Sequence, residues 1–254
     1  MFKISVTPAD IEQLPLGSFK GDIVVVDKPG LEYEKAIFYL RRQKILGFDT
    51  ESRPVFSPGQ HNHGVALLQL SGPKKAYLFR LQTLGMRRSL CCVLSNKNIV
   101  KVGAATADDV HGLQKLQKFQ AAGFVDLQRI AWEWGIRDKS VKKLAANILG
   151  CRISKAQQLS NWEAETLSPS QRIYAATDAW VCREMYLKLL ECEKHPLSTE
   201  EMLPPQDRQA HEAAVERKEA NIAAEKLRAG TSKRKRHRKK KKPNGQNNPE
   251  EGQG

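Results

Sequence analysis

The sequence predicts an α/β core followed by a helical flank and a basic tail. Two observations support this fold class. Short β-branched and apolar runs alternate with helical patterns up to about residue 126, and only helical patterns follow from residue 127 onward. After residue 195, large apolar side chains become rare while Ala, Glu, Lys and Arg become frequent. Strands mixed with helices and then followed by helices alone are typical of a sheet-based core with added helices.

The predicted strands lie in the first half of the chain. They are residues 23–26, 45–50, 65–70, 76–81, 99–103 and 124–126. The apolar pattern of roughly residues 32–43 predicts an amphipathic helix between the first two strands. The Ser-Gly-Pro sequence at 71–73 predicts a hairpin turn, and the Pro and Gly content of residues 52–64 predicts a loop.

Two helices are predicted in the second half. One covers residues 140–149. Ser168 and Gln171 have the spacing of a capping box, with Pro169 at the first helical position, and they begin a long helix that runs to about residue 193. We therefore predict a folded domain over residues 1–195, a charged helical extension over 196–229 and a disordered basic tail over 230–254.

The composition limits the classes of partner. The net charge is +14, and both the tail and the rest of the chain are basic, which favours a polyanion such as nucleic acid. No apolar run approaches the about 20 residues that span a bilayer, and no apolar signal segment follows Met1. The five cysteines are odd in number and lack C-x-x-C spacing, which predicts reduced thiols instead of zinc ligands or disulfides. We expect a soluble intracellular protein without a membrane partner.

Asp49 and Glu51 stand at the end of the apolar run that forms the second predicted strand. Side chains at i and i+2 of a strand share a face, so the two carboxylates point the same way. Carboxylates held together repel and shift each other's pKa unless a cation lies between them. A divalent metal ion is the simplest such cation, and the pair therefore indicates a metal site of the kind that cleaves phosphodiesters.

Two further segments carry acidic residues at informative spacings. Thr106 and Asp109 have capping-box spacing, which places Asp109 in the first turn of a helix. Read alone, Asp108 and Asp109 also suit any helix N-terminus, because its dipole favours negative charge. Tyr174 and Asp178 lie one turn apart on one helix face. Read alone, that pair also suits a partly buried tyrosine beside a surface aspartate.

Taken together, the three segments resemble the motifs of the DEDDy branch of the DnaQ-like 3′–5′ exonucleases, which includes RNase D and the exonuclease domain of the Werner syndrome protein. The motifs stand in the family's order, and the resemblance covers about residues 20–193. Further similar segments are Val65 to Ser71, Phe124 to Leu127, Leu159 to Trp162 and Tyr174 to Trp180. The resemblance implies a ribonuclease H-like fold with a mixed five-stranded sheet flanked by helices. It also implies a metal-dependent nuclease that removes nucleoside 5′-monophosphates from the 3′ end of DNA or RNA.

The resemblance further implies a role for each residue of the catalytic set. Asp49, Glu51 and Asp178 would hold one Mg²⁺ or Mn²⁺ ion. Asp49 would bridge to a second ion, and Asp109 would help to hold this ion through water. One ion would activate the attacking water and the other would stabilise the leaving 3′ oxygen. Tyr174 would orient the water by a hydrogen bond, since a hydroxyl with a pKa near ~10 is a poor base.

The sequence departs from the family pattern at one position and is ambiguous at another. Ser52 follows the first acid pair, where the family often has an aromatic residue that would grip the terminal base. Either Asp108 or Asp109 could supply the second motif, and we assign Asp109 because it lies six residues after Gly103.

Several weaker signals have two interpretations each. Residues 61–63 spell His-Asn-His, the letters of an HNH nuclease, but in a Pro/Gly loop. Asp126 suits a capping residue or an outer partner of the metal site. Trp162 and Trp180 suit core positions or base-stacking platforms. Three lysines either line a phosphate-binding groove or form a solvated face: Lys142, Lys143 and Lys155.

Two alternative functions follow from the same residues. One is RNase D-like trimming of RNA 3′ ends, although residues 196–254 are too short and polar for the extra helical domains of RNase D. The other is a catalytically idle nucleic-acid-binding module, which we would expect to lack at least one of the acids. The single-domain layout favours a bacterial cytoplasmic protein, whereas the basic tail suits nuclear import in a eukaryote, a nucleic-acid tether or a solubilising segment. The sequence does not define the oligomeric state.

Overall fold

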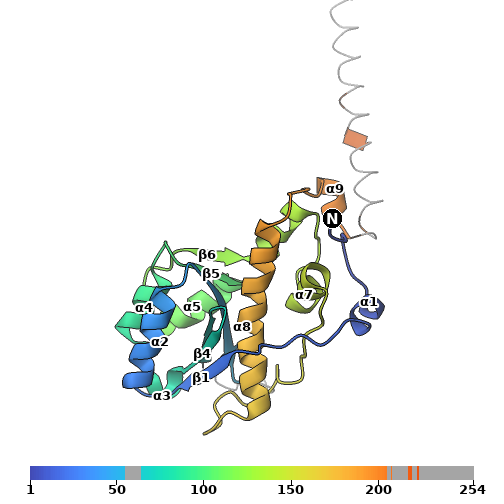
Figure 1. The fold of residues 1–254 in the computed structure, drawn as a ribbon. Helices are drawn as coiled ribbons and strands as arrows, with labels where there is room; N and C mark the ends of the chain where they lie inside the picture. The colour runs from blue at the N-terminus through green and yellow to red at the C-terminus, as the bar shows by residue number, and fades with distance from the viewer. Residues whose placement is uncertain (55–63, 205–206, 208–216, 219–221, 223–254) are drawn as a thin grey trace, which may run out of the picture. The chain divides into compact units, whose positions relative to one another are not determined.

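The computed structural model describes residues 1–54, 64–204, 207, 217–218 and 222 (Figure 1). The chain divides into two units, Met1–Met202 and Leu203–Gly254, and every helix and strand named below belongs to the first. The predicted charged helix and basic tail lie almost entirely outside the described residues, as do residues 55–63 of the predicted loop.

A mixed six-stranded sheet forms the centre of the first unit. Its strands are β1 (Asp22–Val26), β2 (Ile45–Ser52), β3 (Val65–Ser71), β4 (Lys75–Arg80), β5 (Val100–Gly103) and β6 (Phe124–Asp126). The order is β1-β4-β3-β2-β5-β6; β3 is antiparallel to both of its neighbours, and the other neighbouring pairs are parallel. The predicted count of five strands was wrong, because every apolar run named above pairs, including the three-residue β6 at the edge.

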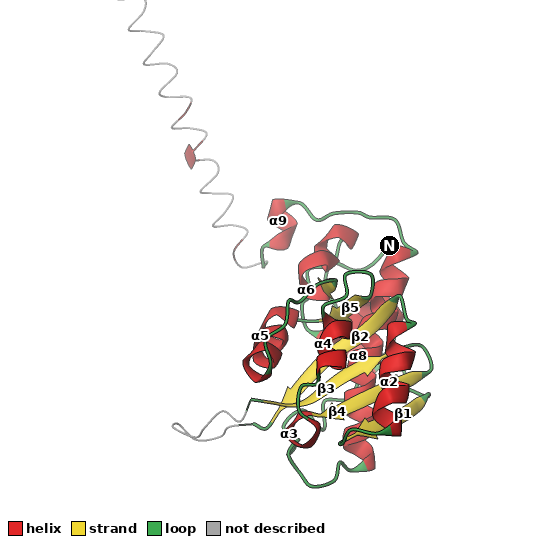
Figure 2. Cartoon of the chain, turned by 90° about the vertical axis from the view of Figure 1, so that its left-hand side faces the viewer, coloured by secondary structure: helices red, strands yellow, loops and turns green. Residues whose placement is uncertain are grey.

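Helices lie on both faces of this sheet. The helices of the described residues are α1 (Pro8–Glu12), α2 (Leu31–Arg41), α3 (Leu81–Leu84), α4 (Arg88–Leu94), α5 (Thr106–Leu116), α6 (Leu127–Ile130), the 3₁₀ turn η1 (Ala131–Trp134), α7 (Val141–Leu149), α8 (Pro169–Leu190) and α9 (Thr199–Met202). Figures 1 and 2 show α8 along one face of the sheet and α2 and α4 on the other. The predicted α/β class is therefore confirmed.

The strands form two cores because alternate side chains point to opposite faces of the sheet. Phe48 and Leu68 pack with Leu40 of α2 on one face. On the other face, Leu67 and Leu78 pack with residues of α8, and Trp162 is buried in the same core. The core interpretation of Trp162 is thus confirmed, since its side chain is only 1% exposed.

The predicted capping box fixes where α8 begins. The Ser168 hydroxyl accepts a hydrogen bond from the backbone N–H of Gln171, and the side-chain oxygen of Gln171 accepts one from the backbone N–H of Ser168. Pro169 occupies the first helical turn, as expected from its preset backbone angle. Helix α8 ends at Leu190, about one turn before the predicted end, and α7 begins after Ser140 as predicted.

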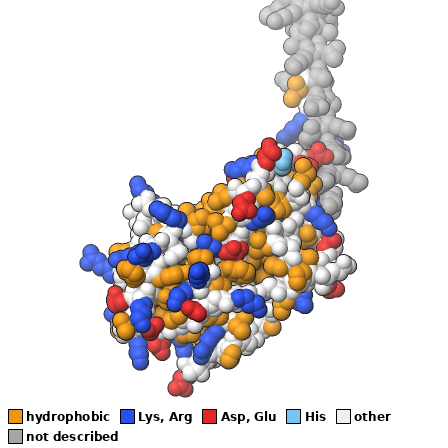
Figure 3. Space-filling view, in the orientation of Figure 1, with side chains coloured by type: hydrophobic (Ala, Val, Ile, Leu, Met, Phe, Trp, Pro, Cys, Tyr) orange, Lys and Arg blue, Asp and Glu red, His pale blue; other side chains and the backbone are white. Residues whose placement is uncertain are grey.

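The described surface carries both charged and apolar side chains. Figure 3 shows Lys and Arg side chains spread over one face of the first unit, between apolar patches. Within the described part of the chain, no helix is both long enough and apolar enough to cross a membrane.

Candidate active site

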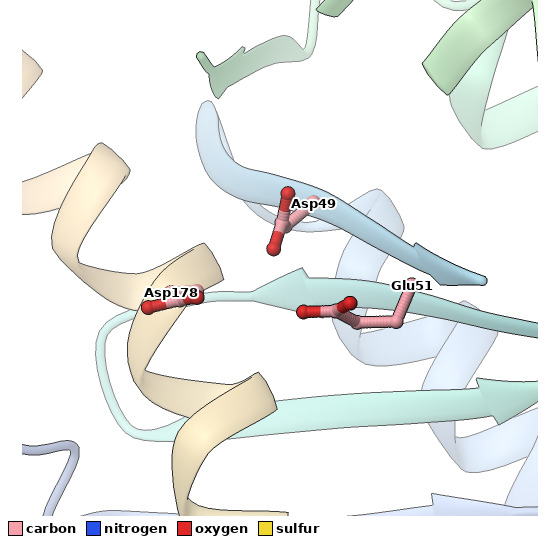
Figure 4. A group of neighbouring side chains, drawn as sticks. All are labelled: Asp49, Glu51 and Asp178. Carbon is pink, nitrogen blue, oxygen red and sulfur yellow. The ribbon is translucent and has the colours of Figure 1, made fainter. Parts of the chain in front are cut away.

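Three carboxylates from β2 and α8 meet on one face of the sheet. Asp49 and Glu51 project from β2 toward α8, as the alternation of side chains predicts, and Asp178 projects from α8 toward them (Figure 4). Each contributes a carboxylate oxygen that lies within 4.8 Å of the other two. All three residues are partly buried. An oxygen-only set of this kind suits Mg²⁺ or Mn²⁺, which prefer carboxylates and water to nitrogen or sulfur ligands.

Gly47 allows the strand and the helix to approach this closely. A Cβ atom at Gly47 would lie 1.8 Å from the carbonyl oxygen of Ala179 in α8, closer than atoms can pack. The two backbones are therefore in direct contact one residue from Asp178 and two from Asp49. No feature of the sequence separated this glycine from the others, so sequence reasoning missed it.

Burial and mutual repulsion raise the pKa values of the clustered carboxyls. Burial raises the pKa of Glu51 to about 9, and the charges of Asp178 and Asp109 add to the rise. Burial, followed by the charges of Asp178, Glu51 and Asp109, raises the pKa of Asp49 well above its usual range. Burial also raises the pKa of Asp178, while the Tyr174 hydroxyl partly offsets that rise. A divalent cation between the groups would counteract these shifts, because its charge favours the ionised carboxylates.

Asp109 lies beside the cluster and is held by β2. The Thr50 hydroxyl donates a hydrogen bond of 2.5 Å to Asp109 Oδ1. Burial raises the pKa of Asp109 to about 6, and the bond from Thr50 counteracts part of this rise. Asp108 is exposed, so it is Asp109 that contacts β2. The sequence did not reveal the role of Thr50, although this residue stands between the two acids of the first motif.

The predicted capping box at the start of α5 was wrong. Helix α5 does place Asp109 in its first turn, but its N-cap is Ala105, which has no side-chain hydrogen bond to the helix. Thr106 is the first helical residue and is buried against the sheet, so its hydroxyl is not in the capping position. Ala105 has a left-handed backbone with φ of 55°, and its amide donates to Asp126 Oδ1. Asp126 also caps α6 through the Gln128 amide, which supports its interpretation as a capping residue.

Tyr174 lies one turn before Asp178 on the same face of α8. Its ring packs against Trp162 at a centroid distance of 5.9 Å, and its side chain is largely buried. Burial, and then the charge of Asp178, raises the pKa of the Tyr174 hydroxyl. This hydroxyl therefore stays protonated and can donate a hydrogen bond at the edge of the carboxylate cluster.

Two hollows flank the acidic residues. One, of about 440 Å³, lies between the end of β2 and α5 and is lined by residues that include Ser52, His111 and Lys115. The other, of about 250 Å³, lies beside Tyr174 and Asp178, and its lining also includes Ser154, Ala156 and Gln157. Asp109 lines the first hollow and Asp178 lines the second, so each hollow borders one acid of the predicted catalytic set.

The candidate lysines fall into different environments. Lys143 forms an ion pair of 3.0 Å with the buried Asp138, which makes Lys143 part of the local structure. The charge of Lys155 offsets a small part of the rise that burial causes in the pKa of Asp178. The His-Asn-His run at residues 61–63 lies outside the described residues.

The raised carboxyl pKa values predict how the stability of the metal-free protein depends on pH. The folded protein keeps the Glu51 proton up to about pH 9, whereas the ordinary pKa is 4.5. A raised pKa stabilises the fold fully below the unfolded value, and this stabilisation is lost as pH rises toward the folded value. We expect the Tm in EDTA, measured by calorimetry, to fall by roughly 4 °C or more between about pH 5.5 and 7.5.

A Glu51→Gln variant is the control for this pH dependence. Its Tm should change less with pH, because the group with the shifted pKa is gone. The pH range stops below 8 because burial lowers the pKa of Lys101 to about 8. Above this pH the folded protein loses the Lys101 proton before the unfolded chain does, so this group makes the Tm rise with pH. Equal slopes in the wild type and the variant would contradict the assignment to Glu51.

Comparison with known proteins gives a consistent picture. The model of the 3′–5′ exonuclease family matches residues 29–192. The bifunctional 3′–5′ exonuclease/ATP-dependent helicase WRN of Mus musculus is 30% identical over 192 residues, which cover 70% of this chain and 13% of that protein. The exonuclease 3′–5′ domain-containing protein 2 of Drosophila melanogaster is 35% identical over 150 residues, which cover 58% of this chain and 25% of that protein. The chain therefore spans a quarter or less of the length of these two relatives.

Solved structures share the fold at lower sequence identity. The exonuclease domain of Aedes aegypti Nibbler has a TM-score of 0.59 at 22% identity and covers 69% of this chain and 91% of its own. RNase D of Escherichia coli has a TM-score of 0.60 at 19% identity and covers 67% of this chain and 44% of its own. These structures confirm the ribonuclease H-like fold implied by the resemblance.

Proposed function

The chain belongs to the 3′–5′ exonuclease family, and on this premise we propose that it removes nucleoside 5′-monophosphates from the 3′ end of a nucleic acid with the help of divalent metal ions. The observation that supports this proposal most directly is the group of three carboxylates within 4.8 Å of one another. All the acids and the tyrosine of the family pattern are present, which favours an active enzyme over an idle binding module.

Each residue of the site has a proposed role. Asp49, Glu51 and Asp178 would hold one Mg²⁺ or Mn²⁺ ion; Asp49 would bridge to a second, and Asp109 would help to hold it through water. Two such ions supply an activated water and charge stabilisation of the leaving oxygen. Tyr174 donates a hydrogen bond that orients the water, because its raised pKa keeps the hydroxyl protonated. Thr50 restrains Asp109 through their hydrogen bond.

The substrate is proposed to be DNA or RNA with a free 3′ end. The net charge of +14 and the hollows beside the acids support an extended polyanion as the ligand. Residues 1–195 would form the exonuclease domain, with 196–229 as a charged extension and 230–254 as a basic tail. We expect the protein to act in the cytoplasm, or in a nucleus if the basic run serves as an import signal.

Digestion of labelled oligonucleotides tests the proposed reaction. We expect a 5′-labelled strand to give a ladder of shortened products and a 3′-labelled strand to release labelled mononucleotide from the start, in Mg²⁺ or Mn²⁺. EDTA should stop both reactions, because the carboxylates alone cannot activate water. Parallel DNA and RNA strands, single-stranded and duplex, distinguish general exonuclease activity from RNA trimming.

Two results would contradict the proposal. Cleavage that continues in EDTA would exclude the metal-dependent mechanism. Mononucleotide release from the 5′ end before the 3′ end would exclude the proposed polarity. Binding without cleavage under all of these conditions would favour the idle module instead.

A further inference from the structure

Gln69 is a fully buried polar residue whose side-chain amide finds no hydrogen-bond partner among the described residues. It lies near the middle of β3, its exposed fraction is 0%, and within residues 1–54 and 64–204 neither its amide nitrogen nor its amide oxygen has a partner. Buried amide groups are nearly always paired, and an unpaired one costs free energy that an apolar side chain of similar size would avoid. The chain therefore keeps a destabilising group at this position.

The sheet register places Gln69 directly opposite Asp49. The strands β2 and β3 are antiparallel, and Asp49 pairs with Gln69 across them. Side chains of directly opposed residues project from the same face with Cβ atoms only about 4.5–5.5 Å apart. The neighbour on the other side is Leu78 of β4, which offers no polar atom. On this face, the cross-strand partner that can accept a hydrogen bond from Gln69 is Asp49.

A carboxylate that binds a metal needs this kind of neighbour. When ionised, it has about four acceptor positions, and those that do not face the ion require donors. A residue that donates to the ligand fixes its orientation, and loss of such a residue typically weakens metal affinity by roughly 10–100-fold. Gln69 supplies two N–H donors in a place that water does not reach.

We propose that Gln69 is a positioning residue that donates a hydrogen bond to the Asp49 carboxylate when Asp49 holds a divalent ion. In this arrangement the amide turns Asp49 toward Glu51 and Asp178. This inference rests on the proposed metal site, and it assigns a function to a residue outside the acidic set.

Substitution with an apolar side chain of similar length tests the proposal. In Gln69→Met, we expect Mn²⁺ affinity, measured by titration calorimetry, to fall by about tenfold or more. The same variant in EDTA should be at least as stable in urea as the wild type, because an unpaired buried amide has been removed. If Gln69 had a purely structural role, the variant would keep the Mn²⁺ affinity of the wild type and would be less stable in urea.

Ser71 provides a matched control on the same strand and face. It is also fully buried, but its hydroxyl already donates to the Gly72 carbonyl, and it pairs with Gly47 instead of an acid. Ser71→Ala should therefore keep the Mn²⁺ affinity of the wild type. Gln69→Leu serves as a second variant if Gln69→Met does not fold.

The outcomes separate the inference from the proposed metal site. Unchanged Mn²⁺ affinity in the folded Gln69 variants would overturn the positioning role while the metal site stands. An equal loss of affinity in Ser71→Ala would also overturn it, because the effect would then come from general disturbance of β3. Absence of Mn²⁺ binding by the folded wild type would overturn both.

Discussion

An Asp49→Asn variant should lose nuclease activity while its metal-free form becomes more stable. The loss should be on the order of a thousandfold or more, since metal stabilisation of a transition state amounts to several kcal/mol and each ~1.4 kcal/mol is tenfold in rate. The gain in stability follows because the variant removes a carboxyl whose pKa is raised by burial and by its acidic neighbours, so that folding at this pH no longer requires a proton at residue 49. Single-turnover digestion and calorimetry in EDTA at about pH 8 measure the two effects.

Asp27→Asn is the control for a change of charge alone. Asp27 is exposed and lies after β1, outside the candidate site. This variant should keep the activity and the Tm of the wild type. An Asp49→Asn protein that is inactive and also less stable would instead indicate that Asp49 supports the fold. That result would contradict the prediction that Asp49 serves metal binding and destabilises the metal-free protein.

Gly47→Ala is expected to destabilise the protein and weaken its metal site together. The new Cβ atom would lie 1.8 Å from the Ala179 carbonyl oxygen, and because that atom belongs to the backbone, α8 must move. Overpacking of this kind costs about 3 kcal/mol, which lowers the Tm by roughly 6–12 °C in a protein of this size. Movement of α8 also separates Asp178 from Asp49, so Mn²⁺ affinity should fall as well.

Gly150→Ala distinguishes this effect from the general cost of replacing a glycine. Gly150 ends α7 with a φ of +64° and has open space around its Cβ position. Its substitution measures backbone strain alone, about 1–2 kcal/mol, and should leave Mn²⁺ affinity unchanged. A Gly47→Ala protein with wild-type stability or wild-type Mn²⁺ affinity would contradict the close contact between β2 and α8.

The parts of the fold that depend on local sequence could be predicted. Strand alternation placed Asp49 and Glu51 on one face, and the capping box at Ser168 located the start of α8. Because Tyr174 and Asp178 are one turn apart on that helix, their common face also followed from spacing alone.

The parts that depend on contacts between distant segments could not be predicted. The bond from Thr50 to Asp109 joins two elements whose relative position is set by the sheet order. The expected cap at Thr106 failed because Asp126, from another strand, stabilises the left-handed turn at Ala105. Gln69 appeared as one polar residue in an apolar run, and only the strand register reveals that it faces Asp49.

The arrangement of the carboxylates has a consequence for the synthesis of the protein. Asp49 and Asp178 are about 130 residues apart in the sequence, and they meet only after α8 has packed against β2. Contacts between such distant segments form late, because closing a long loop costs entropy before any contact stabilises it. A nascent chain would therefore carry the complete first motif, Asp49 and Glu51, well before Asp178 is available to complete the cluster of three carboxylates.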